Sequence, residues 1–318
     1  MPQGSSLGPL LFLVYVNNLH NINLLGKIFS FADDTALIYN AIDKNILLRN
    51  MNYDLKLLTH WFNENKICPN IDKTKILCFS YKKSFELNGE LTLHKSITCL
   101  EHCQNMCSPL STVSGVKYLG RILDSGLTWS AHIGKLSSKL SQLEGIFYLL
   151  QNSFSMCHRR KIYYALYDPI VRYGLKVWGA AALYHLEKVR ILQRKVIRYI
   201  SHPKEGEKTY EKFNTLKILP LNSLYLYVCG LFLAKYKNSF TIEKPISSTR
   251  NVNKISFAAE GWLKEKSRKQ FSFAGPQAIN TLPDSIKQKI VSSKKHKLKK
   301  ELKEFLFERL VSMATATN

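Results

Sequence analysis

Acidic residues are scarce in this sequence. Its 318 residues include 23 Asp and Glu against 46 Lys and Arg, so the formal net charge is +23, and no acidic residue occurs before Asp33. A positive excess of this size points to a polyanionic partner. Nucleic acid is the first interpretation, an anionic membrane surface is the second, and an ordinary solvated surface without such a partner is the third.

Long hydrophobic runs are also missing. The apolar run near the N-terminus, Leu10 to Val16, is far shorter than the ~20 residues that a membrane-spanning helix needs. No basic region precedes this run and polar residues follow it, which excludes a signal peptide. We therefore expect Leu10–Val16 to be buried. We expect the protein to act inside the cell, in the nucleus, the cytoplasm or both, without a membrane and without being secreted.

Cysteines are few and odd in number. The sequence has seven, which excludes the paired disulfide framework of a small secreted protein and favours a reducing compartment. Cys99, Cys103 and Cys107 are spaced four apart, near His94 and His102. Three thiolates and an imidazole could complete a tetrahedral zinc site. The same spacing also describes small residues packed along one face of a helix, and both interpretations stay open.

Strand and hairpin signals occupy the first part of the chain. Two short apolar runs, at 28–31 and 36–39, flank a predicted hairpin turn at Ala32–Thr35. Strands are also expected over residues 76–81 and 115–123. Hydrophobic residues make up 45% of the chain, which is enough for a sizeable core.

Helical patterns dominate the rest. Asp43 is positioned to cap a helix, and beyond residue 125 the apolar residues recur at helical spacing. The sequence therefore predicts an α+β protein with antiparallel hairpins and helices first, followed by mostly helical regions. The predicted division is into residues 1–125, 126–205 and 206–318.

Asp33 and Asp34 are the sharpest chemical feature. Two adjacent carboxylates repel one another, and a divalent metal ion would relieve that repulsion. Mg²⁺ is held by carboxylates together with substrate phosphates, and a pair of ions about 3.5–4 Å apart promotes phosphoryl transfer. An Asp-Asp pair is also ordinary in a turn, because Asp favours turns. The pair by itself therefore leaves catalysis and a plain turn as alternatives.

Two basic segments could bind a polyanion. Arg190, Arg194 and Arg198 recur every four residues, so they share one face of a predicted helix. Guanidinium groups match phosphate oxygens bidentately. A run of lysines extends from Lys294 to Lys300. Both segments are equally compatible with solvated helix faces.

Several segments together carry a family resemblance. The segment PQGSSLGPLLF (Pro2–Phe12) is followed by FADD (Phe31–Asp34), and three further groups follow in order: Trp61–Asn70 with Lys73, Lys117–Gly120, and Ser272–Pro276 with Asn280–Pro283. This order resembles the reverse transcriptases of jockey-like non-LTR retrotransposons. The resemblance spans almost the whole chain. It implies part of a polymerase palm, then a helical thumb and a helical C-terminal region.

The resemblance also implies roles for individual residues. Asp33 would be the main Mg²⁺ ligand, with Asp34 beside it, in an RNA-directed DNA polymerase that joins dNTPs to a primer 3′-OH by two-metal phosphoryl transfer. Lys73 would approach the nucleotide phosphates, with Lys75 a weaker choice. The remaining implied residues line the substrates, namely Gln3 and Gly4 at the nucleotide and template, and Tyr118, Leu119 and Gly120 at the primer end. The implied partners are an RNA template, a DNA primer and an RNA–DNA duplex.

One departure from the family's pattern affects the expected activity. The resemblance implies a further aspartate on a palm strand upstream of the Pro2 segment, and here Met1 stands just before Pro2. We therefore expect an incomplete palm, as in a C-terminal fragment of such a reverse transcriptase, and no polymerisation by this chain alone. The alternative is a catalytically dead, basic, nucleic-acid-binding remnant of a mobile element.

Overall fold

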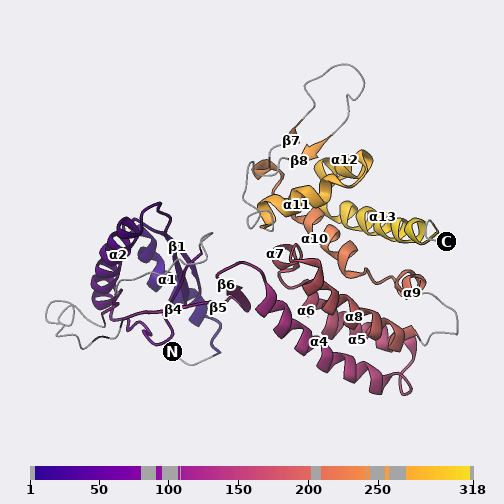
Figure 1. Cartoon of the computed structure of the whole chain (residues 1–318), viewed down its shortest axis with the longest axis horizontal. Helices are drawn as coiled ribbons and strands as arrows, with labels where there is room; N and C mark the ends of the chain where they lie inside the picture. Colours follow the sequence, from indigo (N-terminus) through magenta and orange to yellow (C-terminus); the bar gives the residue numbers. More distant parts are fainter. Residues whose placement is uncertain are drawn as a thin grey trace. The chain divides into compact units, whose positions relative to one another are not determined.

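The structure is a computed structural model of the chain (Figure 1). It describes residues 4–79, 91–94, 107, 109–201, 209–240, 242–243, 255–257 and 270–315. The chain divides into two compact units, Met1–Gly126 (unit 1) and Leu127–Asn318 (unit 2). Helices combined with small sheets fit the predicted α+β class. The division into three parts stays a prediction.

Unit 1 joins helices to three two-stranded sheets in the part that the structure describes. The helices are α1 (Gly8–Val16), the 3₁₀ helix η1 (Asn17–Asn21) and α2 (Lys44–Glu64). The strands are β1 (Lys27–Phe31), β2 (Asp34–Ile38), β3 (Lys75–Leu77), β4 (Ser111–Val113), β5 (Gly115–Tyr118) and β6 (Arg121–Asp124). The pairs β1–β2 and β5–β6 are antiparallel, and β3–β4 is parallel.

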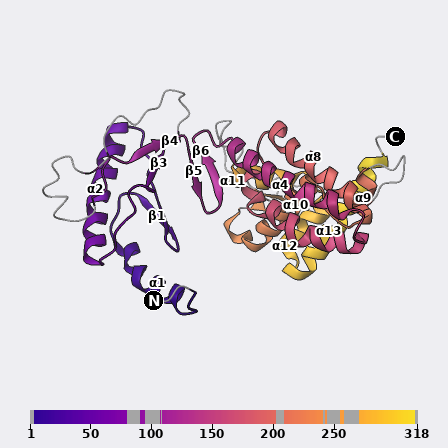
Figure 2. The ribbon, with the colours of Figure 1, turned by 90° about the horizontal axis from the view of Figure 1, so that it is seen from below.

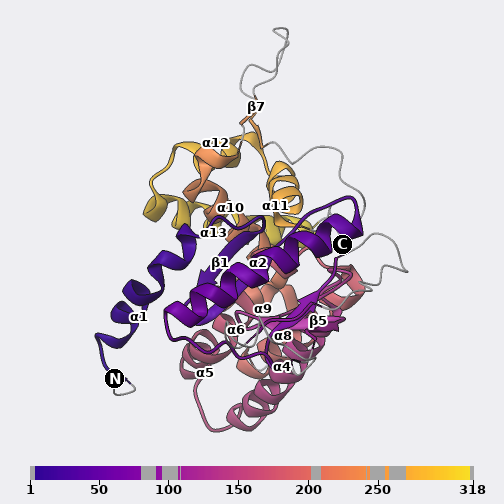
Figure 3. The same cartoon turned by 90° about the vertical axis from the view of Figure 1, so that its left-hand side faces the viewer.

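The long helix α2 forms where the sequence predicts it. The Asp43 carboxylate accepts the backbone N–H of Asn45 at 2.7 Å, which satisfies a free donor of the first turn. The apolar face of α2 buries Leu58 and Trp61 against the hairpin β1–β2, and α2 lies along those strands in Figures 2 and 3. Burying side chains of this size contributes about 1.5–3 kcal/mol each. This packing holds the hairpin on the helix.

The predicted single strand over residues 115–123 is wrong. Tyr118 pairs with Arg121, so the chain reverses through Leu119 and Gly120 and forms the hairpin β5–β6. Both turn residues have positive φ, 45° at Leu119 and 74° at Gly120, which is the geometry of a tight two-residue hairpin turn. The strand expected over 76–81 is the shorter β3, and residues 80 and 81 lie outside the described residues.

The prediction that Leu10–Val16 is buried is also wrong. This run forms α1, and none of its residues is buried. Leu10 is 58% exposed and Val14 is 68% exposed. Only the C-terminal end of the run reaches the core, where Val16 packs beside Leu19. The hydrophobic pattern predicted burial correctly for α2, but the other described residues of unit 1 leave most of α1 uncovered.

Unit 2 is mainly helical in its described residues. Its first helices are α4 (Ser130–Leu150), α5 (Met156–Ile162), the π-helical η2 (Tyr163–Tyr167), α6 (Asp168–Arg172), α7 (Leu175–Trp178) and α8 (Leu183–Ser201). Then follow α9 (Thr209–Thr215), α10 (Leu221–Lys235), η3 (Lys237–Ser239), α11 (Phe271–Asn280), α12 (Asp284–Ser292) and α13 (Lys295–Thr315). The strands β7 (Ile242–Glu243) and β8 (Ser256–Phe257) form a short antiparallel pair.

The core of unit 2 contains a buried polar link. Helices α4 and α8 lie side by side (Figure 1), and their inner faces are apolar. Gln193 of α8 is 2% exposed and donates to the Tyr163 hydroxyl and the Leu219 carbonyl, each at 3.0 Å. Its side-chain oxygen accepts the backbone N–H of Leu221 at 2.9 Å. The amide thereby fixes the chain before α10 to α8 and leaves no buried polar group unsatisfied at this point.

Membrane-spanning helices were sought among the described residues. None of the helices there combines the length and the apolar character needed to cross a bilayer.

Candidate active site

The Asp33–Asp34 pair lies at the tip of a two-residue hairpin, as predicted. Phe31 pairs with Asp34, so Ala32 and Asp33 form the turn, and Ala32 has a positive φ of 52°. Both aspartates are exposed. In the part of the chain that the structure describes, neither carboxylate forms an ion pair. The tip therefore presents two adjacent carboxylates to solvent.

A third aspartate, which the sequence reasoning missed, holds the base of the same hairpin. Asp54 of α2 is completely buried. Its carboxylate accepts the backbone N–H groups of Leu25 at 3.0 Å and Gly26 at 2.9 Å, immediately before β1. It also accepts the Tyr39 hydroxyl at 2.9 Å, immediately after β2. One carboxylate thus ties both ends of the hairpin to α2, and three donors compensate its burial.

The contact around Tyr39 is tight and leaves its hydroxyl neutral. Burial, followed by the hydrogen bond to Asp54 and the charge of that carboxylate, raises the pKa of Tyr39 well above its ordinary value of 10.0. A Cβ atom added at Gly26 would lie 2.5 Å from Cε1 of the Tyr39 ring. Only glycine fits there without movement. The sequence offered one signal that could have identified Asp54, namely its position as a polar residue within the amphipathic pattern of α2.

The other predicted nucleotide-site residues lie on separate segments. Gln3 lies outside the described residues, whereas Gly4 is exposed just before α1 and has a φ of 88°. Lys73 is exposed in the turn before β3, where its backbone N–H donates to the Asn70 side chain at 3.0 Å. Lys75 donates to the Ser111 hydroxyl at 2.8 Å across the β3–β4 pair. Among the described residues, no hydrogen bond or ion pair joins Lys73 to Asp33.

Tyr118, Leu119 and Gly120 occupy the tip of the second hairpin of unit 1. Tyr118 is the last residue of β5, and Leu119 and Gly120 form the turn. Leucine in the left-handed region is strained by about 1–2 kcal/mol. Such strain concentrates at functional sites. The segment that the resemblance assigns to the primer end is thus a backbone turn that projects from its sheet.

The donor set at the first hairpin suits a hard cation. Two exposed carboxylates are suitable Mg²⁺ ligands when water and substrate phosphates complete the octahedron. No group of three or more His, Cys, Asp or Glu side chains is placed to hold a metal ion within the described ranges. Asp33 and Asp34 therefore fit one ion as a partial site. Of the predicted zinc ligands, Cys99, Cys103 and His102 lie outside the described residues, whereas Cys107 and His94 lie within them.

The predicted arginine stripe lies on α8, and internal contacts engage much of it. Glu187 forms ion pairs with Arg190 at 3.2 Å and with Arg194. Arg190 also donates to the Asn222 side chain at 2.6 Å, and Arg198 reaches the Thr209 hydroxyl at 3.5 Å. The three arginines do share a face, as predicted, but Glu187 offsets part of their charge.

Comparison with known protein families finds a match that lies within unit 1. Residues 1–123 match the family described as reverse transcriptase (RNA-dependent DNA polymerase). Over these residues the chain is similar to reverse transcriptases. The hairpin with Asp33 and Asp34 lies inside the matched range, as does the turn at Leu119 and Gly120.

Individual relatives confirm the predicted resemblance to jockey-like elements. The chain is 29% identical over 211 residues to the probable RNA-directed DNA polymerase from transposon BS of Drosophila melanogaster, and 29% identical over 217 residues to the RNA-directed DNA polymerase from mobile element jockey of the same fly. It is 27% identical to the probable RNA-directed DNA polymerase from transposon X-element. Each alignment covers 63% of this chain but only 21–22% of the relative. No solved structure matches the chain.

Proposed function

We propose that this chain supplies part of the active site of an RNA-directed DNA polymerase, which extends a DNA primer with dNTPs along an RNA template. One observation carries the proposal. Two exposed, adjacent carboxylates lie at the tip of a hairpin whose base is fixed by a buried aspartate, inside a segment that matches the reverse transcriptase family. Relatives that resemble the chain over 63% of its length are named RNA-directed DNA polymerases.

In this proposal the hairpin tip positions metal against the substrate. Asp33 and Asp34 would hold Mg²⁺ together with the phosphates of the incoming nucleotide, and the chemistry that the ion would supply there is charge stabilisation of phosphoryl transfer. Lys73 contacts the nucleotide phosphates, and Gly4 and Gln3 line the nucleotide and template. Tyr118, Leu119 and Gly120 support the primer end. Unit 1 then corresponds to part of the palm, and the helices from α4 onward to the thumb and C-terminal region.

We also propose that this chain does not extend a primer on its own. Two-metal phosphoryl transfer needs enough ligands to hold both ions, and the hairpin tip offers two carboxylates. We infer that a further carboxylate must join Asp33 and Asp34 before polymerisation begins. The 318 residues by themselves would then bind Mg²⁺ and nucleic acid but would not extend a primer.

Iron-mediated cleavage tests the metal site without requiring activity. Fe²⁺ that replaces Mg²⁺ should reduce added hydrogen peroxide to hydroxide and hydroxyl radicals, and these radicals should cut the backbone around residues 31–35. Asp33→Asn with Asp34→Asn should abolish that cut. Glu64→Gln, which removes one exposed carboxylate at the end of α2, should leave it unchanged. Cleavage elsewhere, or a cut that survives the double substitution, would overturn the assignment of the metal site.

A primer-extension assay tests separately whether the isolated chain can polymerise. The isolated chain should incorporate no dNTP on an RNA template with Mg²⁺. Template-dependent incorporation that disappears in Asp33→Ala would contradict the inferred limit while supporting the polymerase assignment.

The net charge of +23 favours a second candidate, a basic nucleic-acid-binding remnant without polymerase chemistry. That protein would bind RNA strongly and yet show no iron-mediated cut at the hairpin. RNA binding measured together with iron-mediated cleavage therefore separates the two candidates.

A further inference from the structure

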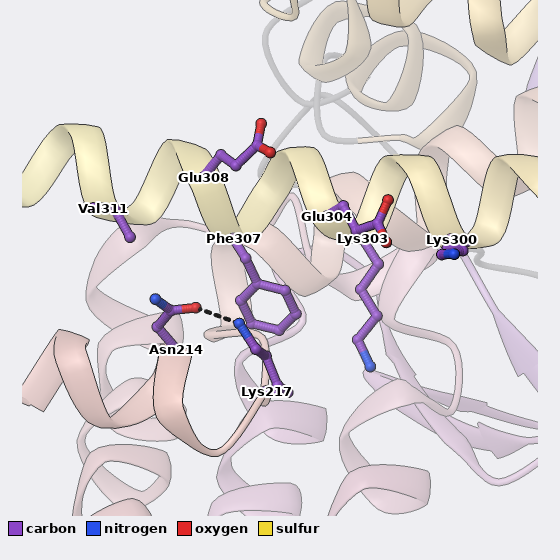
Figure 4. Close-up of a pocket in the computed structure, with 8 residues that line it drawn as sticks. All are labelled: Asn214, Lys217, Lys300, Lys303, Glu304, Phe307, Glu308 and Val311. Atoms are coloured by element: carbon purple, nitrogen blue, oxygen red, sulfur yellow. Dashed lines mark hydrogen bonds between the residues drawn. The ribbon is translucent and has the colours of Figure 1, made fainter.

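A cationic groove runs between α9 and α13 in unit 2. Three lysines line it, Lys217 just after α9 and Lys300 and Lys303 on α13. Figure 4 shows Lys303 and Phe307 projecting from α13 toward the turn that carries Lys217. Two acidic residues, Glu304 and Glu308, also line the groove. Residues more than 80 positions apart in the sequence thus build one surface.

Two aromatic rings gather the cations into a cluster. Nζ of Lys217 lies 5.2 Å from the centre of the Phe307 ring, and Nζ of Lys303 lies 5.8 Å from the same centre. Lys303 is also 5.8 Å from the Tyr164 ring, which has Arg160 at 5.7 Å. Cation–π contacts of this kind stabilise each charge by about 0.5–1 kcal/mol at exposed sites. Phe307 is only 6% exposed, so its ring is part of the groove wall and leaves no free face for a base to stack on.

The backbone at Lys217 is held in an unusual conformation. Lys217 has a φ of 53°. It follows the C-terminus of α9, where the Ile218 N–H donates to the Phe213 carbonyl and the Lys217 N–H to the Asn214 carbonyl, both at 3.0 Å. Glycine is the usual residue at this position of a helix end. The Tyr164 hydroxyl donates to the Lys217 carbonyl at 2.6 Å, and the Lys217 ammonium donates to the Asn214 side chain at 3.0 Å.

The cations of the cluster repel one another. Burial, followed by the nearby charges of Arg172 and Arg160, lowers the pKa of Lys303, and Asp168 offsets this only in part. Asp168 itself pairs with Arg172. A ligand with several negative charges would relieve the repulsion among Lys217, Lys303 and Arg160.

We propose that the groove between α9 and α13 binds the phosphodiester backbone of a nucleic acid, with Lys217, Lys300 and Lys303 contacting successive phosphates. The contacts with Tyr164 and Phe307 position Lys217 and Lys303. Since the Phe307 ring is buried and the groove presents ammonium groups, the site contacts backbone and not bases, and sequence preference should be low. The choice of nucleic acid as the polyanion rests on the proposed function, whereas the anion site itself rests on the contacts above.

Fluorescence anisotropy across a salt series tests this proposal on the full chain, in the absence of divalent metal and with Asp33 and Asp34 intact. Labelled oligo-U and an RNA–DNA duplex of the same length serve as ligands. In the triple variant Lys217→Gln, Lys300→Gln, Lys303→Gln, the slope of log K against log salt should become less steep. If all three lysines contact phosphate, its magnitude should fall by about 2 for the single strand and by about 2.7 for the duplex.

A matched triple variant controls for net charge. Lys56→Gln, Lys139→Gln and Lys289→Gln remove the same three charges from exposed positions on α2, α4 and α12. This variant should change the slope much less. Equal slopes for the two variants would overturn the site, and equal competition by oligoglutamate of matched charge would overturn the assignment to nucleic acid. Because loss of folding could mimic loss of binding, Glu304→Gln with Glu308→Gln is the complementary variant. It should tighten binding several-fold, and unchanged or weaker binding would contradict the proposal.

Discussion

The hydroxyl of Tyr39 donates to the buried carboxylate of Asp54 at 2.9 Å, and this bond joins the end of strand β2 to the middle of α2. The same carboxylate accepts two backbone N–H groups just before β1. The hairpin that presents Asp33 and Asp34 is therefore fixed at its base, and its tip is left exposed to solvent. We regard Asp54 as a positioning residue for the candidate metal site.

Replacing Asp54 with Asn should loosen the hairpin. The amide keeps the shape of the side chain but removes the charge and turns one acceptor into a donor that faces other donors. We expect a loss of about 1.5–3 kcal/mol in the free energy of unfolding of unit 1. Amide hydrogen exchange across residues 27–38 should accelerate. Tyr39→Phe, which removes one of the three bonds, should cost about 1 kcal/mol, and protection equal to wild type in Asp54→Asn would contradict the positioning role.

The pH dependence of stability should reflect Tyr39. Because burial and Asp54 raise the pKa of Tyr39 above 10.0, the folded state favours the neutral hydroxyl. This contribution is fully present below pH 10 and decreases as the pH rises further, since the unfolded chain then releases a proton that the folded chain retains. Urea unfolding of wild type and Tyr39→Phe at several pH values measures it. The stability difference between the two proteins should shrink above pH 10, and a constant difference would exclude the linkage.

Gly26 should not tolerate even one added methyl group. The new Cβ of Gly26→Ala would lie 2.5 Å from the Tyr39 ring, which Asp54 holds in place. We expect a destabilisation of about 1–3 kcal/mol. Gly134→Ala is the matched control, because nothing lies within 4 Å of its added Cβ and it lies within α4. That variant should be stabilised by about 1 kcal/mol through helix propensity. Similar melting temperatures for the two variants would refute this role of Gly26.

Removing Glu187 should strengthen nucleic-acid binding by α8. Glu187→Gln frees Arg190 and Arg194 from their ion pairs. The salt slope for duplex binding should steepen by about 0.9 for each arginine that then contacts phosphate. Glu64→Gln changes the net charge equally in unit 1 and should have a smaller effect. If both variants shift the slope alike, the arginine face of α8 takes no part in binding.

Substitutions at two lysines with a left-handed backbone conformation distinguish the effect of relieving backbone strain from an effect on binding. Lys66 and Lys217 follow the ends of α2 and α9, with φ values of 51° and 53°. Either change to glycine relieves strain and should raise stability by up to about 1 kcal/mol. Only Lys217→Gly should also flatten the salt slope, by about 0.7–0.9. Flattening by Lys66→Gly to the same extent would show that the loss of charge, and not the groove, controls binding.

Local sequence patterns determined much of unit 1. The two apolar runs around Ala32–Thr35 predicted the hairpin, and Asp43 predicted the start of α2, because turn chemistry and helix capping depend on a few neighbouring residues. The family resemblance was likewise present in short segments. The matched range of residues 1–123 bears it out for the segments up to Gly120, whereas the segments at 272–276 and 280–283 lie outside that range. The same local reasoning failed at Leu119–Gly120, because a leucine in a tight turn is a weak signal.

Only the tertiary structure decided which polar groups meet. Asp54 contacts partners 28, 29 and 15 positions away, and nothing in the amphipathic pattern of α2 indicates them. The meeting of Lys217, Lys303 and Arg160 around Tyr164 and Phe307 is likewise a packing outcome. Burial is equally non-local, and for this reason α1 is apolar in sequence and yet exposed. A sequence pattern specifies the face that an element can bury, whereas the surrounding chain determines whether that face is covered.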